Sequence, residues 1–305
     1  MTTWATAAPA PDPKVVRTGE LLAVVAAIAF SMKSILGKLA MARGIDPVPL
    51  LVLRMSFAAP FFLAVLVRDR GAPISRADGA RLVVLGVIGF HAAMVLDFMG
   101  LQYITAGLER LVLYAHPTMI LIIGWLWLRR PAHLREAVGV GVCWAGLALA
   151  VGGDLGAASP EDVARGVGLV LLSAFAYAIY LLATEQLAPR IGARRVGAAA
   201  SLTSGVTLVM QAAWTGQLDE AIGADAETLR LVFALVAIAT VAPVLLLAEA
   251  ITRIGPARAA TIGMIGPFSA ALLGWLVLGE PLAASQLVGG VIVVAGITLG
   301  RPRPG

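Results

Sequence analysis

The sequence predicts an all-α integral membrane protein with ten transmembrane helices, arranged as two inverted repeats of five helices each. The first observation is composition: 59% of the 305 residues are hydrophobic and only 13% are charged, and the mean hydropathy is +0.90. A water-soluble domain has too little interior to cover so much apolar surface. The second observation is that the apolar residues form ten blocks, each near the roughly 20 residues that a spanning helix needs. The third is an internal repeat.

The ten spans follow one another with short connections. Gly, Pro and charged residues mark nearly every break, as in "RGIDPVP" after the first span and "LRRPAHLRE" after the fourth. Only "YITAGLE", between the third and fourth spans, is weakly marked. The first block is too long for the apolar part of a cleaved leader, and a lysine interrupts it. We place the spans near residues 20–42, 48–67, 80–102, 106–128, 134–152, 164–186, 196–215, 229–250, 256–278 and 284–300.

The distribution of Lys and Arg predicts that both termini face the cytoplasm, because cytoplasmic loops are enriched in these residues. With the N-terminus inside, only Arg43, Arg165 and Arg230 fall in outer segments, against sixteen basic residues in inner ones. Residues 1–19 and 301–305 are then cytoplasmic tails of a multi-pass protein in the plasma (inner) membrane. The inner residues are Lys14, Arg17, Arg68, Arg70, Arg76, Arg81, Arg129, Arg130, Arg135, Arg190, Arg194, Arg195, Arg253, Arg258, Arg301 and Arg303.

The internal repeat pairs residues 20–152 with residues 164–300. "GWLWLRRP" at 124–131 recurs as "GWLVLGEP" at 274–281, an offset of 150 residues, and His116-Pro117 matches Gly266-Pro267. Five spans are an odd number, so the second copy enters the membrane from the opposite side. Inverted repeats of this kind are typical of secondary transporters, whose substrate site lies near the bilayer midplane between the halves.

Several short motifs resemble those of the drug/metabolite transporter superfamily, specifically its ten-span EamA-domain members. They are "LGKLA" in the first span, "LVLRMSF" in the second, and the "GWLWL" and "GWLVLGEPL" patterns of the two copies. The resemblance covers roughly residues 20–300. It implies a basket of spans 1–4 and 6–9 around a central cavity, with spans 5 and 10 peripheral, that moves amino acids, other small metabolites or drugs, often outward. One departure is that Glu280 has only Arg129-Arg130 at the equivalent place in the first copy.

Two lysines in the first span are the leading candidates for a substrate site. A Lys at the bilayer centre costs about 2.5–3.5 kcal/mol on insertion scales, so such a residue usually faces a wet cavity or a partner. Lys33 lies at mid-span, and we expect it to face the cavity; a structural ion pair is the alternative. Lys38 lies near the outer end, where an anchoring role is equally open, and shares a helical face with Ser34.

Other charged residues lie inside the spans. Arg54 falls in span 2 and Asp97 in span 3, while Glu109 and Arg110 open span 4. We expect Asp97 to pair with Arg54 or Arg110, because an unpaired buried charge is costly. Together with the two lysines, the four basic groups outnumber the two acids by two. This excess predicts an electropositive cavity that attracts a carboxylate-bearing substrate.

Further candidates line other spans. His91, in span 3, titrates near neutral pH and could relay protons, or it could be a satisfied interior side chain. Ser173, Tyr177 and Tyr180 form a stripe on span 6. In the first span of the repeat the offset is 147 residues, at which Tyr180 matches Lys33, so the two could face each other. We also expect Pro117 and Pro267, at equivalent mid-helix positions, to act as hinges.

These features predict a secondary transporter, not an enzyme, that exports amino acids or related carboxylates by alternating access. A drug or organic-cation exporter of the same fold and a passive facilitator are the alternatives, whereas a lipid enzyme would need a cluster of acids or histidines at one face. No cofactor, metal or nucleic acid is expected, since three scattered histidines and one cysteine make no metal cluster. Proton coupling, and the choice between monomer and homodimer, stay open.

Overall fold

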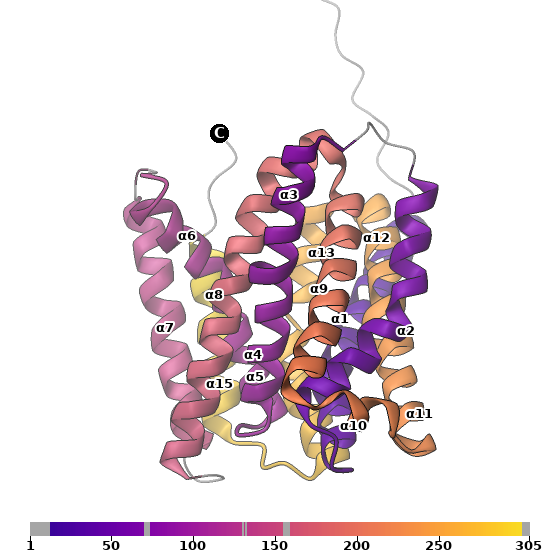
Figure 1. The fold of residues 1–305 in the computed structure, drawn as a ribbon. Helices are drawn as coiled ribbons and strands as arrows, with labels where there is room; N and C mark the ends of the chain where they lie inside the picture. Colours follow the sequence, from indigo (N-terminus) through magenta and orange to yellow (C-terminus); the bar gives the residue numbers. More distant parts are fainter. Residues whose placement is uncertain (1–12, 70–73, 130, 132, 155–158, 301–305) are drawn as a thin grey trace, which may run out of the picture.

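The computed structural model describes residues 13–69, 74–129, 131, 133–154 and 159–300. All regular structure in these ranges is helical (Figure 1). Nine of the described helical segments are long and apolar enough to cross a membrane, and the last apolar helix, Ala284–Leu299, is shorter. They follow the order of the ten predicted spans, so the all-α membrane prediction is confirmed.

Several spans consist of more than one helical segment, and three segments are π-helical. The first repeat contains α1 (Pro13–Met41), α2 (Pro47–Arg68), α3 (Arg76–Val84) with η1 (Leu85–His91) and α4 (Ala92–Leu101), α5 (Ala106–Leu113) with α6 (His116–Leu126), and α7 (Leu134–Asp154). The second contains α8 (Pro160–Ile191), α9 (Ala193–Thr215), α10 (Leu218–Ile222), α11 (Ala226–Val236) with η2 (Ala237–Val241) and α12 (Ala242–Ile254), α13 (Pro256–Gly263) with α14 (Gly266–Leu273) and η3 (Gly274–Leu278), and α15 (Ala284–Leu299).

Two details differ from the sequence prediction. Residues 13–19, predicted as part of a tail, are helical and lengthen α1, which begins at Pro13, a residue type that is favoured at the first position of a helix. The short helix α10, between α9 and α11, was not predicted. The rest of the predicted tails, residues 1–12 and 301–305, lies outside the described residues.

The two repeats interleave. Helix α1 packs against α12, and α4 packs against α8. The two contacts are equivalent, because each joins the first span of one repeat to the third span of the other. Three further contacts join equivalent spans: α2 with α9, α5 with α14, and α7 with α15. The number of crossings is even, so α1 begins and α15 ends at one face, which we call the termini face (top in Figure 1). The other side, where α10 and the start of α11 lie, is the opposite face.

Helices α7 and α15 form a separate pair at one edge of the molecule (Figure 1). Glycines allow their backbones to touch: a Cβ on Gly146 would lie 2.7 Å from the carbonyl oxygen of Gly289, and one on Gly296 would lie 2.5 Å from the amide nitrogen of Cys143. Small residues at such seams are the usual way for membrane helices to pack closely. The pair leaves the other spans to surround the centre of the molecule.

Two spans are broken at mid-membrane. Helix α5 ends at Leu113 and α6 begins at His116, while α13 ends at Gly263 and α14 begins at Gly266. Pro117 and Pro267 are each the second residue of the later helix. Proline lacks an N–H and clashes with the preceding turn, so it kinks or breaks a helix. The repeat therefore places the same interruption in both halves.

Candidate functional site

The broken spans meet at the centre of the molecule. Tyr114, in the first break, donates a hydrogen bond to the carbonyl oxygen of Gly263 at the end of α13 (2.6 Å). Ser31 of α1 donates to the carbonyl oxygen of Gly266 at the start of α14 (2.9 Å). Arg110 reaches the same place from α5: its Nε lies 3.7 Å from the position that a Cβ on Gly266 would take. Three spans of two repeats thus converge on backbone groups that the breaks expose.

An ion cluster lies about one turn closer to the opposite face. We define it as Lys33, Ser34, Asp97 and Glu109. The Nζ of Lys33 donates to Asp97 Oδ2 (2.5 Å) and to Glu109 Oε1 (2.9 Å), and Ser34 donates to Glu109 Oε2. The side chain of Lys33 is 11% exposed and that of Glu109 is completely buried. Lys33 was expected to face the cavity, and the structure instead shows the alternative, a buried ion pair.

Arg54 adjoins this cluster through an aromatic ring. Lys33 Nζ lies 5.7 Å from the centre of the Phe98 ring, and the guanidinium carbon of Arg54 lies 5.6 Å from it. Arg54 also donates to the hydroxyl of Thr240 from Nε (3.3 Å) and Nη2 (3.2 Å). Thr240 belongs to the π-helical η2, and π-bulges are frequent at functional sites. Arg54 is buried, so this arrangement holds a second cation inside the protein.

Glu280 connects the second repeat to the first. Its Oε1 accepts from Lys38 Nζ (2.5 Å), and its Oε2 accepts from the backbone N–H of Ala106 (2.8 Å). The Ala106 N–H belongs to the first residue of α5, where an orphan donor and the positive helix end favour a carboxylate. The side chains of Lys38 and Glu280 are 22% and 13% exposed. We call this contact the Lys38–Glu280 lock.

Further contacts between the repeats lie at the opposite face. Arg43 pairs with Asp225 (2.7 Å) and Glu227 (2.9 Å), and the backbone N–H of Asp46 donates to Glu220 (2.6 Å). Asp225 also caps α11, and hydrogen bonds from the side chain and backbone of Thr228 hold its pKa well below the ordinary value, with Arg43 adding to the effect. This face is therefore closed by polar contacts in two layers, the lock and the surface pairs.

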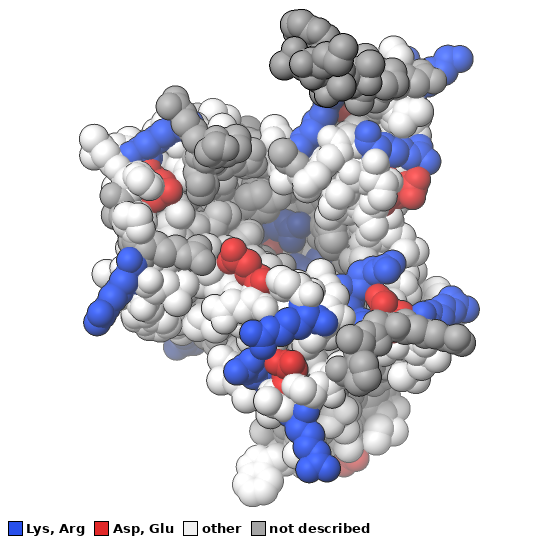
Figure 2. All heavy atoms as spheres, turned by 90° about the horizontal axis from the view of Figure 1, so that it is seen from above, with Lys and Arg blue, Asp and Glu red and all other residues white. Residues whose placement is uncertain are grey.

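The termini face is open by contrast. Figure 2, which views the molecule from the top of Figure 1, shows that this face is hollowed at its centre and that Lys or Arg side chains lie deep in the hollow. Aromatic groups follow one another in the interior: His116 lies 5.5 Å from Tyr177, and Tyr177 stacks on Tyr180 at 5.7 Å between ring centres. The hollow and the closed opposite face together describe a one-sided access path.

The other predicted residues lie between helices. Ser173 donates to the carbonyl oxygen of Ala93 (2.7 Å) and joins α8 to α4. His91, at the end of η1, is within 3.0 Å of the Thr207 hydroxyl, which favours the satisfied-histidine alternative. The sequence left open whether Tyr180 faces Lys33. Tyr180 is buried against Phe90 and the backbone at Gly89 instead, because a glycine leaves room for its ring there.

The predicted partner of Asp97 was wrong. Asp97 forms an ion pair with Lys33 of α1, a helix that contacts both α4 and α5. Among the described residues, it forms no ion pair with Arg54 or Arg110, although its charge acts on Arg54. Sequence reasoning also missed the acid of the lock: Glu280 was noted only as a residue of the loop after the ninth span. With Glu280 included, the four basic groups face three acids and the excess falls from two to one. The acidic residue within "GEP", alone among apolar neighbours, was the available signal.

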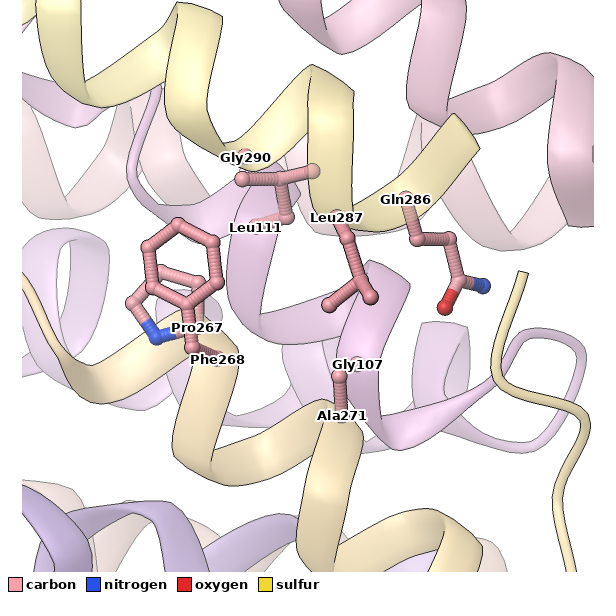
Figure 3. A pocket seen from close by; sticks show the side chains of 8 residues that line it. All are labelled: Gly107, Leu111, Pro267, Phe268, Ala271, Gln286, Leu287 and Gly290. Atoms are coloured by element: carbon pink, nitrogen blue, oxygen red, sulfur yellow. The ribbon is translucent and has the colours of Figure 1, made fainter. Parts of the chain in front are cut away.

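Cavities in the described part of the chain lie beside the helices of the site. One, lined by residues such as Gly107, Ala271 and Gln286, lies where α5, α14 and α15 meet (Figure 3) and has a volume of about 10 Å³. A larger groove of about 340 Å³ runs between α2 and α9 and is lined mainly by apolar side chains such as Met55 and Met210. The first has room for little more than one water. The second suits an acyl chain better than a polar molecule.

Two oppositely inserted five-span units, with broken helices facing each other at mid-membrane and one face closed, define a membrane transporter of the inverted-repeat class. The chain belongs to the EamA-like transporter family, which matches residues 17–152 and again residues 164–300. It is 30% identical over 280 residues to the uncharacterized transporter YcbK of Bacillus subtilis, covering 89% of this chain and 88% of the relative.

More distant likenesses agree with this family. An uncharacterized transporter of Archaeoglobus fulgidus is 25% identical over 138 residues, which is 45% of this chain and 47% of the relative. A crystal structure that covers 93% of this chain, and 97% of its own, has a TM-score of 0.58 at 17% identity. At that identity the likeness concerns the fold alone.

Proposed function

We propose that this protein carries a small carboxylate-bearing metabolite, an amino acid or a related compound, out of the cytoplasm by alternating access. The observation that carries the proposal is the meeting of the two broken spans beside Arg110 at mid-membrane. Discontinuous helices at the interface of inverted repeats are where secondary transporters hold their substrates.

The closed and open faces support the alternating-access part of the proposal. The lock joins α1 of the first repeat to the segment after η3 of the second, and the surface pairs join Arg43 to α11. All of these contacts must separate before the centre can open to the opposite face. Hollowing of the termini face (Figure 2) indicates the state in which the site is reached from that side.

Direction follows from the charge of the loops. The sixteen-to-three distribution of Lys and Arg supports a cytoplasmic position of the termini face in a plasma-membrane protein. The structure then corresponds to a cytoplasm-open state, which is the state in which an exporter takes up its cargo. The interior holds four basic groups and three acidic ones, and the one positive charge in excess favours an anionic cargo over a cationic one. The seven groups are Lys33, Lys38, Arg54, Arg110, Asp97, Glu109 and Glu280.

The experiment is counterflow in proteoliposomes. Vesicles loaded with unlabelled compound are diluted into the same labelled compound, over a panel of L-amino acids, mono- and dicarboxylic acids and organic cations. Accumulation of labelled carboxylates, saturable and dependent on internal substrate, is the expected result. Accumulation of organic cations alone would refute the substrate class, and non-saturable equilibration without counterflow would indicate a passive facilitator.

A further inference from the structure

The proposed function leaves open which interior cation meets the carboxylate of the cargo. Lys33 is held by Asp97 and Glu109, and Lys38 is held by Glu280. Arg54 is buried between the Phe98 ring and the Thr240 hydroxyl. An anion that bound either lysine would first have to displace a carboxylate already in place, and leaving a buried charge without its partner is strongly unfavourable. Arg54 already uses its Nε and Nη2 donors on Thr240.

Arg110 differs from these three cations. Its Nε is a buried atom with no hydrogen-bond partner in the part of the chain that the structure describes. Its guanidinium carbon lies 6.0 Å from the centre of the Tyr114 ring, which orients the planar group without using its N–H donors. The residue as a whole is only partly buried. A guanidinium has five donors in a fork that matches a carboxylate, so Arg110 has free capacity for an anion.

The surroundings of Arg110 suit a carboxylate as well. Gly266, the first residue of α14, lies against both Tyr114 Oη and Arg110 Nε, at 2.7 Å and 3.7 Å from the position of a Cβ. The absence of a side chain there lets the guanidinium approach the start of α14, whose end carries a positive partial charge. Beyond Tyr114, the ring of His116 lies 6.4 Å from the Tyr114 ring and 5.5 Å from the Tyr177 ring, so these polar aromatic groups form the nearby wall.

One neighbouring acid must be weighed. Glu109 precedes Arg110 in the chain and is completely buried. Both oxygens of Glu109 already accept hydrogen bonds, one from Lys33 and one from Ser34. Glu109 therefore belongs to the ion cluster and leaves the guanidinium donors of Arg110 to another acceptor.

We propose that Arg110, at the meeting point of the α5/α6 and α13/α14 breaks, binds the carboxylate of the transported metabolite, and that Lys33 is a structural residue. This assignment rests on the proposed function and names the residue that sets its substrate class. The carboxylate of the metabolite forms hydrogen bonds with the guanidinium beside the start of α14, and Tyr114 and Tyr177 contact the other atoms of the metabolite. Glycine at position 266 is required for this arrangement.

The test compares acids with their primary amides. Purified protein is titrated with L-amino acids and the matching amino-acid amides, using ligand-induced thermal stabilisation for binding and inhibition of counterflow for transport. The wild type is expected to prefer the acid by about 10- to 100-fold, the size of a charge-assisted hydrogen bond. Arg110→Gln should reduce this preference to about threefold or less while amide binding changes little. Arg110→Lys should keep part of it.

A matched control is Arg165→Gln, because Arg165 also lies over a tyrosine ring, that of Tyr103 at 5.2 Å, away from the breaks. It should keep the wild-type preference. An unchanged acid preference in Arg110→Gln would overturn the assignment while leaving the proposed function in place. A wild type that neither binds nor transports any carboxylate would overturn the proposed function, and the assignment with it. Binding is read on the folded protein, so loss of transport in a variant does not obscure the result.

Discussion

Breaking the Lys38–Glu280 lock should open the protein toward the opposite face. In Glu280→Gln the amide oxygen can still accept the N–H of Ala106, so the change removes mainly the charge that holds Lys38 at 2.5 Å. Both side chains are largely but not completely buried, which places the pair above the weak surface class. A hydrogen bond to a charged group contributes about 1.5–3 kcal/mol. The equilibrium between closed and open should therefore shift by about 10- to 150-fold.

The shift can be measured as the labelling rate of a cysteine reporter. Ala271 lies against Gly107 where α14 packs on α5, and it lines the small cavity in Figure 3, which accommodates part of an added sulfur. Ala271→Cys, in a Cys143→Ala background, is treated with a membrane-impermeant maleimide. The reporter should react about 10- to 150-fold faster when Glu280→Gln is added, because α5 and α14 separate only in the open state.

Two comparisons make this prediction strict. Lys38→Gln should raise the rate as much as Glu280→Gln, and the double variant should react no faster than either, because both remove one interaction. Glu249→Gln removes a charge from an exposed pair with Arg253 at the other end of the molecule and should change nothing. If Glu280→Gln labels at the wild-type rate, the lock does not hold the face closed and the reasoning is refuted.

Three further predictions concern stability. Lys33→Met should lower the free energy of unfolding by about 3–5 kcal/mol, with partial recovery on adding Glu109→Gln; thermal unfolding in detergent that shows no loss would contradict the buried ion pair. Gly146→Ala should cost about 1–3 kcal/mol through overpacking, whereas Gly141→Ala on the same helix has open space and should be neutral. Asp225→Asn should lower the melting temperature at pH 7. Because the pKa of Asp225 is depressed in the folded protein, its carboxylate stabilises the fold at pH values above the unfolded pKa near 4. The difference in melting temperature between the wild type and Asp225→Asn should therefore shrink as the pH falls from about 4 through the folded pKa.

The sequence predicted the architecture because membranes leave few alternatives. Hydrocarbon requires long apolar helices, and a repeat with an odd number of spans requires inversion, so composition and the 150-residue offset determined the helix order. Interruption of the helices at Pro117 and Pro267 also followed from local chemistry. Hinge motion at these prolines is still a prediction. The extension of α1 to Pro13 and the helix α10 were missed because neither changes the apolar pattern.

The site was predicted less well, since the pairing of charged side chains depends on which sides of the helices are in contact. Lys33 was recognised as exceptional from its depth alone, but the sequence could not show that α4 and α5 bring two carboxylates to it. Tyr180 matched Lys33 by repeat position, yet equivalent positions on inverted copies need not meet. Glu280 lies outside the predicted spans, so a count of charges within spans left it out. Contacts between distant segments are the information that a single sequence does not contain.

The inverted repeat has one further consequence, which comes from the groups that break its symmetry. At the offsets of the repeat, Lys33 corresponds to Tyr180, Glu109 to Ala259, and Glu280 to Arg130. Two identical copies could exchange their conformations to give two states of equal energy, related by a two-fold rotation, but the ion cluster and the lock exist on one side only. The resting population is then weighted toward one orientation. In a carrier without external energy, detailed balance requires unequal half-saturation constants on the two sides to be matched by unequal maximal rates.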